Sequence, residues 1–150
     1  MRSAALTTGR RFLVVLDPGE DLLETVSSWA VAHGVTSATI DMFFGAFRRV
    51  GLIAADGPIE DPEAPLPASV DVTYLEGVGA GSISTVDGIP RAHLHVAAGV
   101  KAEAGAAYAG HVLYAETHYT VELVVQEILA PTFAPRLSPE FGIPCMHFSG

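Results

Sequence analysis

The sequence has few basic residues. It holds one lysine, Lys101, and seven arginines against seventeen acidic residues, which gives a formal net charge of −9. Proteins that bind nucleic acids neutralise phosphates with clusters of Lys and Arg. Here the only adjacent basic pairs are Arg10-Arg11 and Arg48-Arg49. Direct binding of DNA or RNA is therefore the least expected function.

Long apolar runs and cysteine are also scarce. No run approaches the ~20 apolar residues of a membrane-spanning helix. The first apolar run, Phe12 to Leu16, is too short to be the core of a signal peptide. The single cysteine, Cys145, excludes an internal disulfide and suits a reducing compartment. We therefore expect a soluble, cytoplasmic protein without a membrane segment.

Charge of either sign is sparse as well. Charged residues make up 17% of the chain and apolar residues 49%, whereas about 25% charged is usual for a soluble domain. A chain of 150 residues suits one domain. The low charge indicates that part of its surface is buried between subunits.

One helix is predicted, and the rest of the chain reads as strands. Asp17 is the expected N-cap, with Pro18 at the first helical position, and Gly34 is the expected C-terminal glycine. Asp87-Gly88 predicts a hairpin turn, and Gly45-Ala46 predicts a tight link between two strands. The strands are expected at 11–16, 36–44, 47–54, 70–77, 79–86, from Pro90 onward, 108–114 and 117–128. This pattern predicts an α+β fold: a mostly antiparallel sheet of about seven strands with one major helix.

The composition also suggests how the chain is divided. Residues 1–10 read as a flexible leader, 11–130 as the folded domain and 131–150 as a proline-rich C-terminal tail. The segment 56–68 contains four prolines and four acidic residues, so we expect a surface loop there.

Three of the six histidines lie in two short stretches that carry the strongest functional signal. His93 and His95 are two residues apart, so on a strand their side chains point to the same face. His111, which follows Gly110, is the candidate for a third ring arriving from a neighbouring strand. Together they would supply the three nitrogen donors of a catalytic zinc site that keeps one position open. The alternative is a pair of polar residues on a solvated strand face, since histidine is also a common surface residue.

Two other residues are candidates for chemistry beside such a metal. Arg91 precedes His93 by two residues and shares its strand face, so we expect it to anchor an anionic substrate. Glu122 is the candidate general acid or base, with Glu76 a weaker one. The alternatives are an inter-subunit salt bridge for Arg91 and a solvated strand position for Glu122.

The order of these motifs follows a recognisable pattern. A helix opened by Gly19-Glu-Asp-Leu-Leu-Glu-Thr-Val26 is followed by Val72 to Ser84, by Asp87 to Val96, by Gly110-His111 and by Thr120-Val-Glu122-Leu. Over roughly residues 11 to 129 this order resembles the PPC domain family (plants and prokaryotes conserved domain, DUF296) in its stand-alone prokaryotic form.

The resemblance implies a seven-stranded antiparallel sheet with one major helix, assembled as a homotrimer, in a fold similar to that of α-acetolactate decarboxylase. It also implies zinc bound by His93, His95 and His111. Plant members carry AT-hooks that bind DNA, but this sequence has no Arg-Gly-Arg-Pro element. Ala109 stands where the family usually has glycine, and His118 and His147 fall outside the family pattern.

Two kinds of function remain open from the sequence. One is a zinc-dependent lyase or hydrolase that acts on a small carbonyl or carboxylate compound. The other is a non-catalytic module that binds a small ligand, such as an anion, or a protein partner. An open metal position in a pocket would favour the enzyme, and a sealed site would favour the module.

Overall fold

The computed structural model describes residues 1–54, 69–140 and 142–149, so the loop predicted over 56–68 lies outside the described residues. Within these ranges the chain forms seven strands, one α-helix and one short 3-10 turn. In chain order they are β1 (Thr7–Leu16), α1 (Leu22–His33), β2 (Ala38–Ile53), β3 (Val70–Val86), β4 (Ile89–Val100), the 3-10 turn (Lys101–Glu103), β5 (Ala106–Ala130), β6 (Thr132–Leu137) and β7 (Pro144–Ser149).

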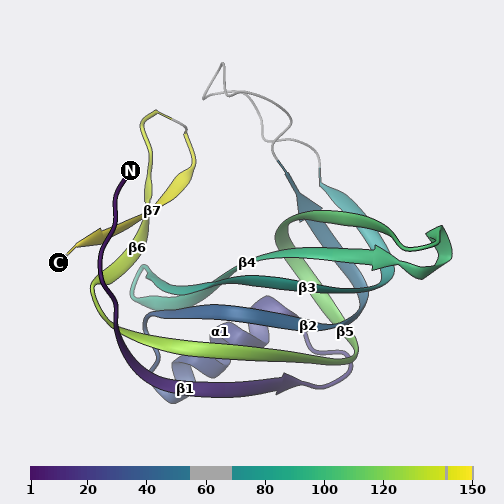
Figure 1. Cartoon of the computed structure of the whole chain (residues 1–150), viewed down its shortest axis with the longest axis horizontal. Helices are drawn as coiled ribbons and strands as arrows, with labels where there is room; N and C mark the ends of the chain where they lie inside the picture. The colour runs from purple at the N-terminus through teal and green to yellow at the C-terminus, as the bar shows by residue number, and fades with distance from the viewer. Residues whose placement is uncertain (55–68, 141, 150) are drawn as a thin grey trace.

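Five strands form one antiparallel sheet that closes on itself. Their order is β1-β5-β2-β3-β4, and β4 also pairs with β5, which completes a ring. The 25-residue strand β5 makes this possible because its first part pairs with β4 and the rest runs along β2 and β1. Figure 1 shows how strongly β5 bends. The mostly antiparallel sheet and the single helix agree with the prediction.

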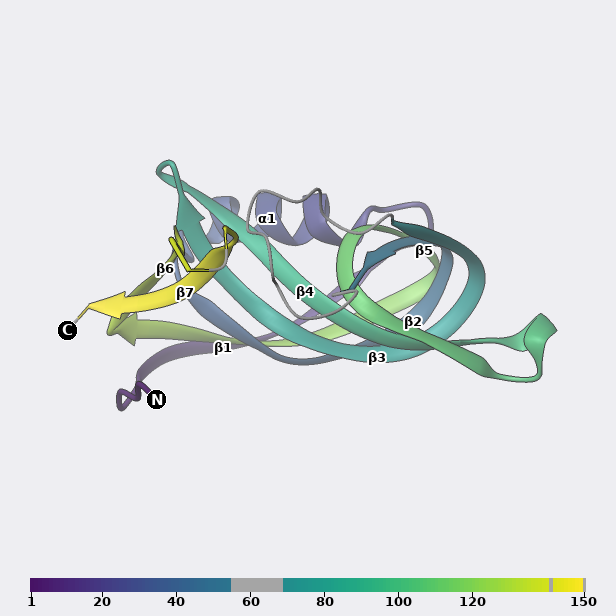
Figure 2. The ribbon, with the colours of Figure 1, turned by 90° about the horizontal axis from the view of Figure 1, so that it is seen from above.

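The helix covers one side of this sheet and defines where the core lies. Figure 2 shows α1 along the sheet, where it packs on β4 and β5. Leu22, Val26 and Ala30 of its apolar stripe are fully buried, as are Phe43 and Leu94 from the strands. The helix is not long and apolar enough to cross a bilayer, and no other described helix is either. On each strand, the side chains that point away from this core form the outer face of the sheet.

The long strands correct several predicted breaks. Residues 36–54, 70–86 and 108–128 were each expected to hold two strands, but β2, β3 and β5 are continuous. Gly45 pairs with Gly77 of β3 on one side and with Val121 of β5 on the other. A Cβ at Gly45 would collide with the Thr120 carbonyl oxygen. These glycines therefore allow close approach of bent strands and do not end them.

The helix begins four residues later than predicted. Asp21, not Asp17, is the N-cap, and its Oδ1 accepts a 3.0 Å hydrogen bond from the Glu24 N–H. Its Oδ2 accepts another from the Ala115 N–H, also at 3.0 Å, which ties the cap to β5. Gly19 has φ of +90°, which a helix does not allow. The predicted end is confirmed, because Gly34 adopts the left-handed conformation with φ of 66°.

Both ends of the chain contain paired strands. β1 begins at Thr7, so part of the predicted leader pairs with β5. Arg10 holds this end in place through an ion pair with Glu127, with Nη2 and Oε1 2.6 Å apart. Hydrogen bonds from the Arg10 side chain and backbone lower the pKa of Glu127 to about 2. In the predicted tail, β6 and β7 form an antiparallel hairpin.

Candidate metal centre

Three imidazoles converge on the outer face of the sheet. His95 of β4 is directly opposite His111 of β5, and His93 lies two residues earlier on β4. The ring centroids are 4.8 to 5.3 Å apart, and the candidate ligand nitrogens all lie within 4.8 Å of one another. A tetrahedral ion with bonds of about 2.0–2.1 Å needs donors about 3.3 Å apart, which small ring rotations can reach. The convergence predicted from the sequence is therefore present.

The local sequence explains why β4 presents its histidines in this way. The predicted Asp87-Gly88 turn is present, and both residues have positive φ, 50° and 79°. It starts β4 in register with β3, and the period-two alternation then buries Leu94 while its two histidine neighbours point outward. The turn and the buried leucine together fix which face carries the rings.

The glycine before His111 has a structural role. A Cβ at Gly110 would lie 2.6 Å from the Ile53 carbonyl oxygen of β2. Glycine therefore lets the first part of β5 lie against β2 while pairing with β4. On β3, Ala80 stands opposite His95. The small side chain of Ala80 leaves the space beside the rings open.

The electrostatics of the cluster favour the uncharged form of His93 and of His111. Partial burial lowers the pKa of His93, and the nearby His95 ring lowers it further. The pKa of His111 is lowered by burial first and then by the two other rings. Metals bind the neutral form of imidazole, so these shifts reduce competition from protons. Three imidazole nitrogen donors, with no carboxylate among the described members of the cluster, are typical of zinc sites that keep a coordination position for water or substrate.

The structure brings Arg91 beside the histidines but not Glu122. Arg91 is exposed, lies two residues from His93 on the same side of β4 and has no polar partner among the described residues. Glu122 is half-buried in the second part of β5, where it stands opposite Val15 and Phe44. It does not belong to the histidine cluster of its own chain.

The other histidines have different neighbours. The His118 Nδ1 accepts a 3.3 Å hydrogen bond from Arg48 Nε. The His147 ring lies 2.9 Å from an Arg2 nitrogen, and His33 stacks on Trp29 with centroids 4.9 Å apart. None of them belongs to the histidine cluster described above.

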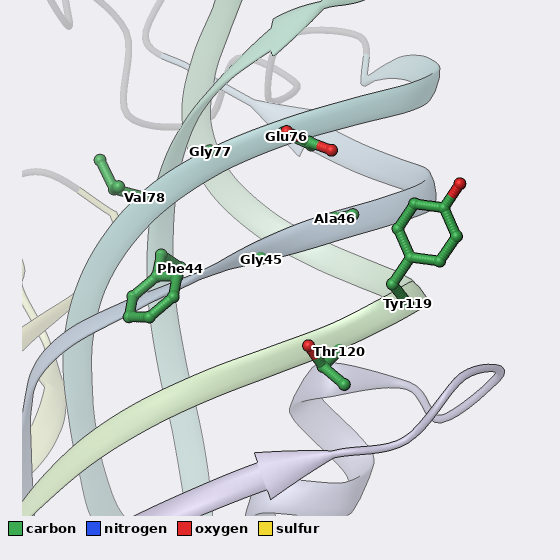
Figure 3. Close-up of a pocket in the computed structure, with 8 residues that line it drawn as sticks. All are labelled: Phe44, Gly45, Ala46, Glu76, Gly77, Val78, Tyr119 and Thr120. Atoms are coloured by element: carbon green, nitrogen blue, oxygen red, sulfur yellow. The ribbon is translucent and has the colours of Figure 1, made fainter.

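A hollow on the outer face was not predicted from the sequence. It has a volume of about 420 Å³ and is formed by residues of β2, β3 and β5. Figure 3 shows Phe44 and Val78 at one end and Glu76 and Tyr119 at the other. Its floor contains Gly45, which was predicted to link two strands, and Gly77, which was predicted to be the last residue of one.

The model of the Plants and Prokaryotes Conserved (PCC) domain matches residues 3–129. The chain belongs to this family. The resemblance drawn from the motif order is thereby confirmed. No curated protein sequence matches the PCC chain significantly.

Solved structures share the fold of this PCC protein, two of them over nearly its whole length. A plant- and prokaryote-conserved (PPC) protein from Pyrococcus horikoshii is 21% identical, with a TM-score of 0.83 over 98% of this chain and 97% of that chain. A metal-containing protein from Archaeoglobus fulgidus is 26% identical, with a TM-score of 0.80 over 97% and 98%. A Staphylococcus aureus protein of unknown function, described as similar to alpha-acetolactate decarboxylase, is 14% identical, with a TM-score of 0.52 over 81% of this chain and 53% of that one.

Proposed function

We propose that this PCC protein binds zinc through His93, His95 and His111 and uses the open position of the ion on a small carbonyl or carboxylate compound. The observation that carries the proposal is the convergence of three imidazoles within 4.8 Å, without a fourth ligand among the described residues. The fold likeness to a protein described as metal-containing supports it.

The proposed chemistry is that of a lyase or a hydrolase. A bound zinc polarises a carbonyl oxygen or lowers the pKa of a bound water to about 7. Arg91, exposed and unpaired among the described residues, is positioned to hold the carboxylate of a substrate whose other oxygen faces the histidines. The distant likeness to a protein similar to alpha-acetolactate decarboxylase is consistent with this reaction class but supports the fold alone.

The proposed assembly is a homotrimer. Leu13, Val15 and Met42 are exposed on the outer face of β1 and β2, and a group of exposed apolar side chains favours contact with another chain. The acid–base role of Glu122 requires such an assembly, because Glu122 lies apart from the histidines of its own chain. In the trimer, Glu122 of one subunit would face the metal of another.

The second candidate function is a non-catalytic module that binds a small ligand. It is favoured by the lack of a carboxylate beside the three histidines among the described residues. DNA binding remains the least favoured function, because the chain carries a net charge of −9 and no cluster of basic residues in its sequence.

Metal content tests the proposal directly. Protein purified without a His-tag should contain about one zinc per chain by elemental analysis, and the H93A/H95A/H111A variant should contain none. H118A is the matched control, since it removes a histidine of β5 that lies outside the cluster. Far-UV circular dichroism should be unchanged in both variants. Equal zinc in the triple variant and the parent would refute the proposal.

Turnover separates the two candidate functions. Small 2-oxo and 2-hydroxy acids would be screened with zinc-loaded protein, chelated protein and the R91A variant. Turnover that requires zinc and weakens in R91A supports the enzyme. Saturable binding without product, measured by calorimetry on the same compounds, supports the module. Light scattering coupled to gel filtration measures whether three chains assemble.

A further inference from the structure

The hollow on the outer face carries a second inference, independent of the histidines. Figure 3 shows its two ends, with Glu76 and Tyr119 at one end and Phe44 and Val78 at the other. The volume of about 420 Å³ is enough for a small organic molecule. We name it the Glu76–Tyr119 pocket.

The floor of the pocket is backbone. Gly45 of β2 and Gly77 of β3 face each other in register. A Cβ at Gly77 would collide with the backbone of β4 at Ala97, and one at Gly45 would collide with the backbone of β5. Both added Cβ atoms would also meet buried side chains, those of Ala98 and Val121, so the two glycines face the core side of the sheet. Their backbone is therefore the floor between the outward-facing side chains of the pocket.

The carboxylate of Glu76 is exposed and has no polar partner among the described residues. It makes no hydrogen bond or ion pair with any described residue, and the four ion pairs of the described chain use the other carboxylates Asp41, Asp71, Glu116 and Glu127. The nearby Arg48 is engaged, since its Nη1 pairs with Glu116 at 3.2 Å. Glu76 therefore keeps its negative charge available to a ligand.

Two aromatic rings are uncovered in the same pocket. Tyr119 is 63% exposed and Phe44 is 41% exposed. The Tyr119 ring lies against the His118 ring, with centroids 4.1 Å apart. His118 is in turn held by Arg48. The Tyr119 ring therefore packs on one neighbouring ring and is otherwise largely exposed.

A free carboxylate beside aromatic faces recognises positive charge. A cation is attracted both by the carboxylate and by the electron-rich face of a ring. The net charge of −9 adds a general attraction for cations and opposes anions. We infer that the Glu76–Tyr119 pocket binds a small organic cation: an ammonium group seated between Glu76 and Tyr119, with an apolar body lying toward Phe44 and Val78.

The pocket is separate from the histidine cluster of its own chain. Val78 pairs with Ala97 of β4, and Ala80 pairs with His95. The pocket residue Glu76 is thus four residues along β3 from the position opposite His95, about 13 Å in an extended strand. Removing the histidines should leave the pocket intact.

The test uses 2-phenylethylammonium as the probe, titrated into the full-length protein at low ionic strength and followed by calorimetry. 2-Phenylethanol and phenylacetate are the neutral and anionic comparators. We expect one probe per chain, with the alcohol binding about tenfold more weakly and phenylacetate not at all. The H93A/H95A/H111A variant should bind the probe equally well, which excludes coordination of the amine to a metal.

Variants locate the binding to the two ends of the pocket. E76Q should weaken binding of the probe about fivefold, and E140Q, which removes the same charge on the β6–β7 hairpin, should not. Y119A should weaken binding by about three- to fivefold, whereas Y119F, which keeps the ring, should retain it.

Three results would overturn the inference. The first is equal affinity for the ammonium and the alcohol, and the second is an equal effect of E76Q and E140Q. The third is no binding of the probe to the native protein together with a change of oligomeric state in E76Q, which would mean that a basic side chain of another copy fills the pocket.

Discussion

His95 of β4 lies directly opposite His111 of β5, and their ring centroids are 5.3 Å apart. The two strands are joined by the short 3-10 turn Lys101–Glu103, so one hairpin carries the whole histidine cluster. The site therefore depends on the register of a single strand pair and on the packing beneath it.

Zinc should stabilise the folded chain. A ligand that binds only the native state adds about 2.7 kcal/mol to the free energy of unfolding when its concentration is 100 times Kd. Thermal unfolding of chelated protein should shift to higher temperature on addition of zinc, and H93A/H95A/H111A should show no shift. A shift of the same size in that variant would place the binding elsewhere.

Neighbouring residues of β4 should respond differently to truncation. Leu94 is fully buried and His93 is exposed. L94A should lower the free energy of unfolding by about 2–5 kcal/mol, because it leaves a cavity in the core. H93A should change the stability of the metal-free protein little and weaken zinc binding. Urea unfolding of chelated samples, paired with zinc titration, measures both effects.

Alanine in place of Gly45 or Gly77 should destabilise the sheet. G45A and G77A each place a methyl group against the backbone of the next strand, and overpacking of this kind costs about 1–3 kcal/mol. G99A is the matched control in β4, since its nearest contact would be the Gly105 carbonyl oxygen at 3.3 Å. If G99A destabilised the protein as much as G45A, the close approach would not be the cause.

The Arg10–Glu127 pair should give the stability a defined pH dependence. The pKa of Glu127 is lowered from 4.5 to about 2. A carboxylate with a lowered pKa stabilises the fold above its unfolded pKa, and this contribution is lost as the pH falls through the folded value. E127Q should therefore be less stable than the parent at pH 7. The difference should shrink between pH 4.5 and about 2, as measured by urea unfolding at each pH. A difference in the free energy of unfolding that stays constant over this pH range would contradict this origin.

The alternation along β4 was enough to predict that His93 and His95 share a face, because that property is local. The partner strand of the third histidine was a hypothesis, since register depends on how β5 bends. Gly45 was predicted to link two strands, and Gly77 to be the last residue of one, because a glycine in a turn and a glycine where two paired strands approach closely look the same in the sequence. The collision that requires glycine involves residues far away along the chain.

The start of the helix and the position of Glu122 show the same limit. Asp17 and Asp21 both satisfy the local rules for a cap, and Asp21 is selected by its second hydrogen bond, to Ala115 of β5. Glu122 carries the right chemistry for an acid–base group, but its register opposite Phe44 is set by the order of strands in the sheet. Neither contact can be read from a local pattern.

The pairing between β4 and β5 is also the join that turns the sheet into a ring. An ion bound by both His95 and His111 would link β4 and β5 and so stabilise the closure of the sheet. Loss of the ion would then loosen the ring first at the Ala106–His111 end of β5, so the architecture ties occupancy of the metal centre to closure of the sheet.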